Sequence, residues 1–392
     1  RATRVLAGLP DSTLVRRAAA IARETAVLMG LPAARLDNLV FACLLHDLGV
    51  SSTAEHRRLV SGAAGHNTQA HCERAFELLQ PFAHLSLLAN AIRYHHTPWA
   101  DLPADLGEAD AIDSNLIQLA DRVDALLLRH GLDNPLFHAA SICREISALA
   151  GHVLRPEIVA AFLAAATREA FWIALVPRHV QSYLADLALP QWGVTIEFPQ
   201  FRHVARLVSS IVDAKSHFTA AHSLGVAQLS RHLGERMGFG PDALSKMEIA
   251  GLMHDIGKLC VPDEIVEKPA RLTSAEFSVM ERHSFETYQI LRHVPGLETI
   301  AEWAAFHHEA LNGQGYPFRR TAADLTTEAR IVAVADVFQA LAQARPYRGP
   351  QALEEISRLL EEFASKGVLD ADIVAVARDD LDSSWRAATQ TH

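Results

Sequence analysis

The sequence of this chain repeats itself. When the 392 residues are shifted by 208, the first half aligns with the second without a gap around one motif. Leu44 to Gly49 fall on Leu252 to Gly257, so the dipeptide His46-Asp47 falls on His254-Asp255. Two copies of one motif-bearing unit predict two similar domains. With loop-length differences, further counterparts follow in the same order: His66 for His283, His95-His96 for His307-His308, and Asp121 for Asp336.

Both halves show the periodicity of helices. Apolar residues recur at spacings of three and four among Ala, Leu, Glu and Arg, as in Ser12 to Met29, Asp242 to Met253 and Ala352 to Phe363. Alternating patterns typical of strands are almost absent, and Gly193 to Phe198 is the best candidate. We therefore predict an all-α fold of two helical-bundle domains with little or no sheet. The boundary is placed near residues 186–200, which gives domains 1–187 and 188–392.

The charge balance limits the partners of the chain. Its 36 Lys+Arg against 46 Asp+Glu give a net charge of -10, and binding to a nucleic-acid polymer needs a clustered basic face instead. No uncharged apolar run is long enough for a membrane span, so we expect a cytoplasmic protein. The sequence starts at Arg1 without a Met or a signal-peptide pattern, which suits a fragment and leaves upstream residues open.

Cysteine and histidine usage point to different chemistry. The cysteines form no CxxC pair, so neither a disulfide framework nor a zinc ribbon is expected, and reduced, mostly buried thiols are the plain interpretation. These are Cys43, Cys72, Cys143 and Cys260. In contrast, 21 histidines are unusually many, and histidine is the commonest metal ligand.

The second half contains an ordered set of candidate metal ligands: His222, His254, Asp255, His283, His307, His308 and Asp336. Imidazoles with carboxylates suit Fe, Mn or a similar first-row metal better than Ca or Mg, which prefer oxygen ligands. A lone histidine on a helix is usually a packing or surface residue, but chance does not readily produce the same order twice. Seven ligands exceed the needs of one ion. Two divalent ions that share Asp255 would use all seven and leave positions for water and a phosphate.

The second half resembles the HD-GYP branch of the HD superfamily of metal-dependent phosphohydrolases. The resemblance covers roughly half of the chain and rests on HDIGK (His254 to Lys258), HHEALNGQGYP (His307 to Pro317), VADVF (Val334 to Phe338) and RPYR (Arg345 to Arg348). Members of that branch are bacterial phosphodiesterases that hydrolyse cyclic dinucleotides, chiefly cyclic di-GMP. The resemblance therefore implies tandem HD-type domains and a cyclic dinucleotide substrate.

The resemblance also implies a role for each ligand. One metal would be held by His222, His254, Asp255 and Asp336, and the other by Asp255, His283, His307 and His308. Some family members bind a third metal through a Glu four residues before the first His. Phe218 stands there in this chain, so we predict two metals, Fe or Mn.

The expected reaction is an in-line phosphoryl displacement by a metal-bridging hydroxide, which a two-metal site both generates and positions. Asp255 and Lys258 are the predicted catalytic residues, with Lys258 directed to the scissile phosphate as a point charge. Lys258, Tyr316, Arg345 and Arg348 are predicted to bind the substrate. The plain alternatives are a surface lysine at Lys258 and a solvent-exposed helix end at Arg345.

The chain departs from the family pattern at several positions. Asn312 and Gln339 stand where Asp is frequent, and neither is a predicted ligand. In the first half, Leu14 stands at the position of His222 and Val50 at that of Lys258, and no GYP-like loop follows His96. We predict a degenerate first domain with a regulatory or structural role, although its histidines and carboxylates could still hold one ion.

The sequence leaves several functions open. Hydrolysis of cyclic di-GMP to linear pGpG, with GMP as a further product, is the leading hypothesis. The alternatives are a phosphodiesterase for another cyclic dinucleotide such as cyclic GMP-AMP, and a receptor that binds the nucleotide without hydrolysis. Homodimer formation is also open.

Overall fold

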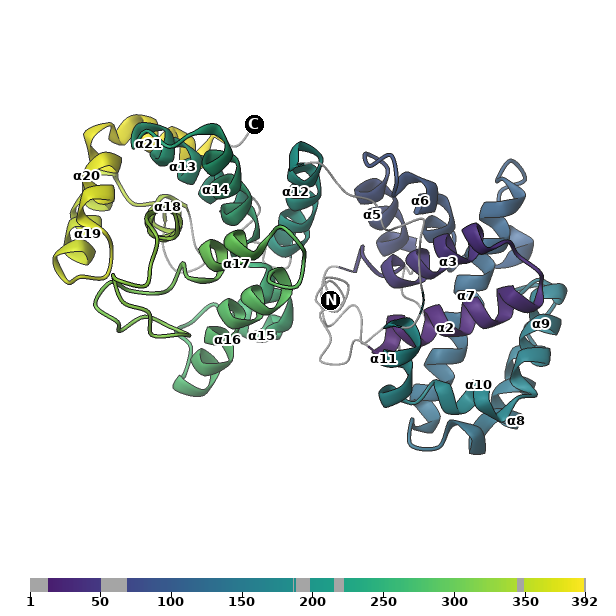
Figure 1. The fold of residues 1–392 in the computed structure, drawn as a ribbon. Helices are drawn as coiled ribbons and strands as arrows, with labels where there is room; N and C mark the ends of the chain where they lie inside the picture. Colours follow the sequence, from purple (N-terminus) through teal and green to yellow (C-terminus); the bar gives the residue numbers. More distant parts are fainter. Residues whose placement is uncertain are drawn as a thin grey trace. The chain divides into compact units, whose positions relative to one another are not determined.

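A computed structural model describes residues 13–50, 69–185, 187, 198–214, 222–343 and 349–390. The chain divides into two compact units, Leu9–Thr195 and Ile196–His392, called here the N-terminal and the C-terminal unit. Helices account for nearly all of the regular structure in both units (Figure 1).

The N-terminal unit is a bundle around one long helix, α7 (Glu108–His130), which packs against α2 (Thr13–Leu28), α3 (Ala33–Leu45) and α6 (Ser86–Arg93). The buried face of α7 is rich in Leu, Ile, Val and Ala, so the bundle core is mainly apolar. The remaining helices are α5 (Gln69–Leu79), the short η1 (Trp99–Asp101), α8 (Pro135–Ser147), α9 (Pro156–Ala166), α10 (Glu169–Ala174) and α11 (Pro177–Ala185).

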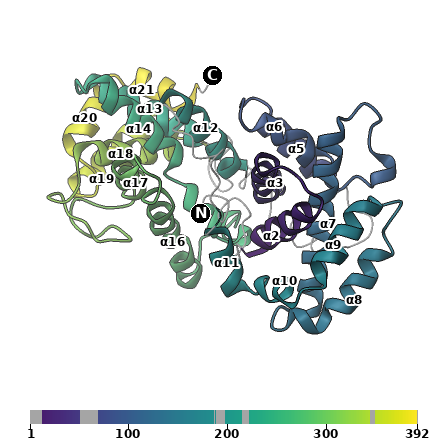
Figure 2. The same cartoon turned by 45° about the vertical axis from the view of Figure 1, so that its right-hand side comes forward.

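The C-terminal unit has the same plan. Its central helix α18 (Thr327–Ala342) lies among α13 (His222–Arg236), α14 (Pro241–Met253) and α17 (Glu298–Ala305), as Figures 1 and 2 show. The remaining helices are α12 (Phe198–Ala214), η3 (Ile256–Cys260), α15 (Asp263–Val266), α16 (Ser274–Leu291), α19 (Leu353–Ser365), α20 (Ala371–Asp379) and α21 (Leu381–Thr389).

Equivalent helices of the two units end at equivalent residues. α3 and α14 lie 208 residues apart at both ends, and each is followed by the histidine of a His-Asp pair. The backbone angles of these two histidines agree within one degree: φ -56° and ψ -34° for His46, and φ -56° and ψ -33° for His254. The internal repeat therefore extends to the local backbone on which each candidate site is built.

A close approach of backbones explains the glycine after each His-Asp pair. A Cβ on Gly257 would lie 1.9 Å from the carbonyl oxygen of His283, and a Cβ on Gly49 would lie 2.0 Å from that of His71. Only glycine allows this contact. It brings the helix that carries the third histidine against the His-Asp turn in both units.

The prediction of an all-α fold is confirmed, since the described residues contain helices and two isolated bridges but no strand. The strand expected over Gly193 to Phe198 is not seen where it can be checked. Phe198 begins α12, and residues 193–197 lie outside the described residues. Phe198 joins an amphipathic helical pattern that continues to Ala214, which outweighs the short alternation before it.

Two further expectations can be compared with the structure. All four cysteines are among the described residues and none is in a disulfide, but only Cys43 and Cys72 are buried, and Cys260 is exposed because it ends η3 at the surface. The expectation of mostly buried thiols was therefore only half right. Within the described ranges, no helix combines the length and the apolar character needed to cross a membrane.

Candidate metal centre

The C-terminal unit brings all seven candidate ligands together. They come from five parts of the fold: the first residue of α13, the turn after α14, the middle of α16, the end of α17, and the middle of α18. All are buried except His308, whose side chain is 29% exposed. These residues are His222, His254, Asp255, His283, His307, His308 and Asp336.

The carboxylate of Asp255 stands between two groups of histidines. Its Oδ2 atom lies 3.3 Å from Nε2 of His254 and 3.6 Å from Nε2 of His222. Its Oδ1 atom lies 3.5 Å from Nε2 of His283 and 4.0 Å from Nε2 of His307. Each oxygen thus faces a different group, which is the arrangement of a carboxylate that bridges two ions.

Asp336 supplies the second carboxylate. Its Oδ1 atom lies 3.2 Å from Nε2 of His222 and 3.7 Å from Nε2 of His254. Its Oδ2 atom lies 4.0 Å from Nδ1 of His308. Asp336 therefore adds a carboxylate oxygen to the group of His222 and His254.

Hydrogen bonds on the far side of the rings define which nitrogen faces the cluster. Nδ1 of His254, His283 and His307 each donates to a backbone carbonyl oxygen at 2.7 Å. Nδ1 of His222 donates to Oε1 of Gln339 at 2.5 Å. A carbonyl oxygen can only accept, so Nδ1 carries the proton and the lone pair of Nε2 points into the cluster.

A cation fits between these lone pairs. The Nε2 atoms of His222 and His254 are 3.1 Å apart, and those of His283 and His307 are 3.2 Å apart. Two acceptors at such a distance repel each other unless a positive charge lies between them. Oδ1 of Asp255 is also buried without a hydrogen-bond partner, and buried polar atoms normally have one. The donor set is therefore suited to two transition-metal ions.

The protonation state of the ion-free cluster differs between its histidines. Burial lowers the pKa of His283 to about 4, and partial burial next to His283 lowers the pKa of His308 to about 3, so both rings are neutral near pH 7, as metal binding requires. Burial also opposes the protonation of His254, but the charge of Asp255 outweighs it and raises the pKa of His254 to about 9. Without an ion, a proton on His254 compensates the buried carboxylate.

Two predicted substrate contacts lie beside this cluster. Lys258 Nζ donates to Oδ2 of Asp255 at 2.5 Å, and its side chain is 24% exposed. The ring of Tyr316 lies 4.8 Å from that of His308, centroid to centroid. Burial raises the pKa of Tyr316, which keeps its phenol protonated. Arg345, Arg348 and Phe218, for which sequence predictions were made, lie outside the described residues.

The N-terminal unit carries a second cluster of similar geometry. Nε2 of His46 lies 3.3 Å from Oδ2 of Asp47, and Nε2 of His71 lies 3.6 Å from Oδ1 of Asp47. The Nε2 atoms of His71 and His95 are 3.5 Å apart. Asp121 is at the edge of this cluster, 4.0 Å from Nε2 of His46.

The comparisons with known proteins agree with the two clusters. Models of the HD domain match residues 15–126 and 206–373. The 3'3'-cGAMP-specific phosphodiesterase 1 of Vibrio cholerae is 37% identical over 345 residues, which cover 86% of this chain and 80% of the relative. The cyclic di-GMP phosphodiesterase of Thermotoga maritima is 36% identical over 165 residues, 42% of this chain and 44% of the relative.

This chain belongs to the HD-domain family of metal-dependent phosphohydrolases. It contains two HD domains, one in each unit. A crystal structure of the cyclic GMP-AMP-specific phosphodiesterase V-cGAP3 of V. cholerae supports the fold, with a TM-score of 0.66 at 22% identity over 97% of this chain and 96% of that chain.

The structure changes one alignment within the N-terminal HD domain. His71, on α5, stands where His283 stands in the C-terminal HD domain, whereas His66 lies outside the described residues. The sequence contained the signal for this position. The pairs His95-His96 and His307-His308 differ by 212 residues, and the same shift takes His283 to His71.

Sequence reasoning also missed Glu309, which organises the loop that carries Tyr316 in the C-terminal HD domain. Its buried carboxylate accepts hydrogen bonds from the backbone N–H groups of Phe318, at 2.7 Å, and Arg320, at 2.8 Å. Both groups follow Tyr316 and Pro317, so Glu309 ties this loop to the His307-His308 end of α17. The available signal was the Glu directly after the His-His pair.

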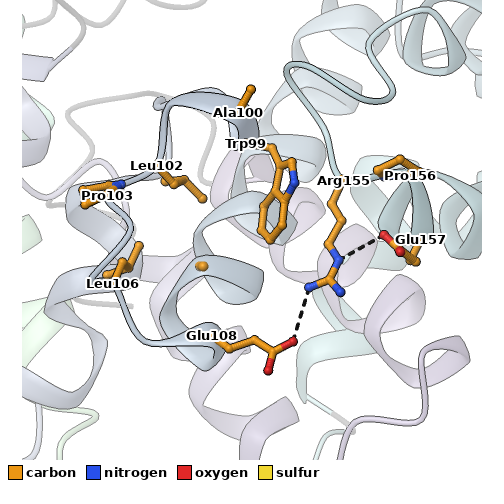
Figure 3. A pocket seen from close by; sticks show the side chains of 10 residues that line it. Trp99, Ala100, Leu102, Pro103, Leu106, Glu108, Arg155, Pro156 and Glu157 are labelled. Atoms are coloured by element: carbon orange, nitrogen blue, oxygen red, sulfur yellow. Dashed lines mark hydrogen bonds and ion pairs between the residues drawn. The ribbon is translucent and has the colours of Figure 1, made fainter.

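A pocket in the N-terminal unit is a separate feature (Figure 3). The guanidinium of Arg155 lies over the ring of Trp99, 4.9 Å from its centroid, and pairs with Glu157 at 3.0 Å and with Glu108 at 3.6 Å. None of the cluster histidines is among the residues that line it. Both carboxylates are already paired with Arg155, so the pocket does not resemble a metal centre.

Proposed function

We propose that this HD-domain protein is a metal-dependent phosphodiesterase that hydrolyses a cyclic dinucleotide in its C-terminal domain. The observation that carries the proposal is the convergence of imidazole Nε2 atoms on the two oxygens of Asp255, with Lys258 and Tyr316 beside them. Two bound metal ions and the nearby ammonium group of Lys258 would stabilise the negative charge that develops on the phosphate oxygens in phosphoryl transfer.

The proposed ligands form two sets that share Asp255. One set adds His222, His254 and Asp336, and the other adds His283, His307 and His308. Two divalent ions of the Fe or Mn class would supply positive charge for the phosphate oxygens and a hydroxide at neutral pH. The neutral state of His283 and His308, which follows from their lowered pKa values, prepares these rings to act as ligands.

Residues of the chain itself provide the remaining contacts in this proposal. Lys258, which contacts Asp255 in the ion-free cluster, directs its charge to the scissile phosphate when the substrate binds. The protonated phenol of Tyr316 offers a hydrogen bond and an aromatic face to a ribose or a base. Arg345 and Arg348 remain proposed contacts for the second phosphate or a guanine edge.

For the substrate, we place 3'3'-cGAMP first and cyclic di-GMP second. A relative that matches over 86% of this chain is 3'3'-cGAMP-specific, and so is a second one that matches over 65%. The cyclic di-GMP phosphodiesterases of T. maritima and Pseudomonas aeruginosa match over 42% and 41% of this chain. This order reverses the leading sequence hypothesis and favours its stated alternative.

The two domains have different roles in this proposal. Residues 188–392 carry the reaction, and residues 1–187 have a regulatory or structural role, because Leu14 and Val50 replace a ligand and the lysine. Homodimer formation stays a prediction.

The test is turnover of the full chain after anaerobic purification and metal analysis. Wild type, Asp255→Ala and the control Asp242→Ala, at an exposed residue on α14, are incubated with each nucleotide and analysed by chromatography. Linear product from wild type and Asp242→Ala, but not from Asp255→Ala, is expected, with faster conversion of 3'3'-cGAMP. Faster conversion of cyclic di-GMP would reverse the substrate order. Bound metal and nucleotide without product would contradict the enzyme and favour the receptor.

A further inference from the structure

One half of the two-metal arrangement is complete in the N-terminal HD domain. The set Asp255, His283, His307 and His308 has a counterpart for each member: Asp47, His71, His95 and His96. The equivalent distances agree closely. The carboxylate Oδ1 lies 3.6 Å from Nε2 of His71 and 3.5 Å from Nε2 of His283.

The third and fourth members are placed in the same way. The ring centroids of His71 and His96 are 5.1 Å apart, as are those of His283 and His308. Those of the adjacent histidines are 4.1 Å apart in the N-terminal pair and 4.0 Å apart in the C-terminal pair. Nδ1 of His95 donates to the carbonyl oxygen of Ile92 at 2.6 Å, so its Nε2 lone pair faces the cluster.

The other half of the arrangement has been replaced. At the constant shift of 208 residues, Leu14 stands for His222 and Arg17 for Gly225. Arg17 is fully buried and pairs with the carboxylate of Asp124 through Nε and Nη2. Asp124 in turn stands where the C-terminal domain has Gln339, the hydrogen-bond partner of His222. A guanidinium, which cannot lose its charge, thus occupies this part of the N-terminal domain.

A thiol also distinguishes the retained half. Cys72 stands at the position of Ser284, and its Sγ lies 3.6 Å from Nε2 of His71 and 3.6 Å from Nδ1 of His95. The thiol is a neighbour of the proposed ligands, and the ligands themselves, three imidazoles and one carboxylate, are of the types that zinc accepts. The site also has four protein ligands, the number found in closed structural zinc sites.

We propose that the N-terminal HD domain binds a single zinc ion through Asp47, His71, His95 and His96, with Arg17 in place of a second ion. All four ligands of this ion come from the protein. The ion therefore links the turn after α3 to α5 and to the residues that follow α6. Its role is structural, and it does not depend on which nucleotide the C-terminal domain accepts.

The test counts ions in the full chain when the C-terminal cluster is disabled by Asp255→Ala and His307→Ala. After dialysis against zinc-buffered solution, elemental analysis is expected to find one zinc per chain. Adding His71→Ala is expected to remove it. The matched control His84→Ala changes an exposed histidine of the same domain and is expected to retain the ion. No bound zinc in the parent variant, or equal zinc after His71→Ala, would overturn the proposal.

A second measurement does not depend on the folding of the His71 variant. Cobalt(II) is substituted into the parent variant, and its visible spectrum is compared before and after Cys72→Ser. A cobalt site of low coordination number is expected in both proteins, because Cys72 lies beside the proposed ligands and is not one of them. An octahedral spectrum would contradict the proposed site, and loss of the low-coordination band in Cys72→Ser would overturn the proposed ligand set. Neither readout uses nucleotide turnover, so this proposal can fail independently of the phosphodiesterase.

Discussion

The two HD domains arrange the same helices around clusters that differ in one half. Both place a His-Asp turn against the helix of the third histidine, through Gly49 in one domain and Gly257 in the other. They differ along α2 and α13, where a leucine replaces the first ligand. The difference shows that one side of such a cluster can change while the histidines on the other side keep their positions.

The packing around these helices explains how the loss is accommodated. A Cβ on Gly225 would lie 2.2 Å from the carbonyl oxygen of Ala388 and 2.9 Å from Cγ of Gln339. Glycine thus admits α21 and the partner of His222 in the C-terminal domain. In the N-terminal domain, Arg17 fills the equivalent position and pairs with Asp124. The N-terminal domain therefore has a fixed organic cation one helical turn from the position at which the C-terminal domain has the proposed ligand His222.

The largest expected difference concerns the bridging carboxylates. Asp255→Ala should lower kcat/KM for the cyclic dinucleotide by roughly 1,000-fold or more, because it removes a ligand from both ions, each of which contributes several kcal/mol. Asp47→Ala should lower it far less. Steady-state kinetics on the two variants checks this, and comparable losses would show that both clusters take part in turnover.

The buried ion pair should dominate the stability of the N-terminal domain. Arg17→Leu leaves Asp124 buried without its guanidinium, which should reduce the free energy of unfolding by about 3–5 kcal/mol. The double variant Arg17→Leu/Asp124→Leu should recover much of it. Scanning calorimetry measures the shift. Arg358→Ala, which breaks an exposed pair on α19, is the control, and an Arg17→Leu transition as high as that of the control would contradict the assigned role.

The lysine that the C-terminal domain has at Lys258, where the N-terminal domain has Val50, should have a smaller effect on kcat/KM. Lys258→Ala should lower kcat/KM by about 10- to 100-fold, the value of one charge-assisted hydrogen bond to a phosphate. Val50→Lys, at the equivalent position, should add no activity to an Asp255→Ala chain. Lys246→Ala, at a surface ion pair of α14, is the matched control. If its rate fell as far as that of Lys258→Ala, the proposed contact would be wrong.

The two clusters should differ in how their affinity for a metal ion depends on pH, because a proton competes with the ion in only one of them. The expected difference is a factor of about ten in affinity per pH unit. In the ion-free state the pKa of His254 is raised to about 9, so below that pH an ion must displace its proton, and affinity should rise about tenfold per unit as pH increases. The pKa of His46 is likewise raised to about 9, but the proposed zinc site does not use His46. Zinc titrations of the Asp255→Ala/His307→Ala variant should therefore show a shallower slope than those of Asp47→Ala/His71→Ala. Equal slopes would place His46 among the ligands.

Much of the candidate site could be predicted from sequence because its residues lie in short motifs on helices. His254-Asp255 and His307-His308 are adjacent in the chain, and a repeat of their order gave two domains. The position of His71 was harder to predict, because it depends on how many residues lie between Gly49 and α5, and that number differs from the one between Gly257 and α16. A spacing of 212 residues between the His-His pairs would have identified it.

Sequence by itself determined the all-α class, the two-fold repeat and the seven clustered residues of the C-terminal domain. Helical periodicity and motif order are local properties, and they need no knowledge of what packs against them. Only the tertiary structure decided that Arg17 meets Asp124, 107 positions away, and that Glu309 holds the Tyr316 loop. Such pairings depend on which helices pack together and on burial, which makes an unpaired charge unfavourable. Neither contact can be predicted from the spacing of residues within a single helix.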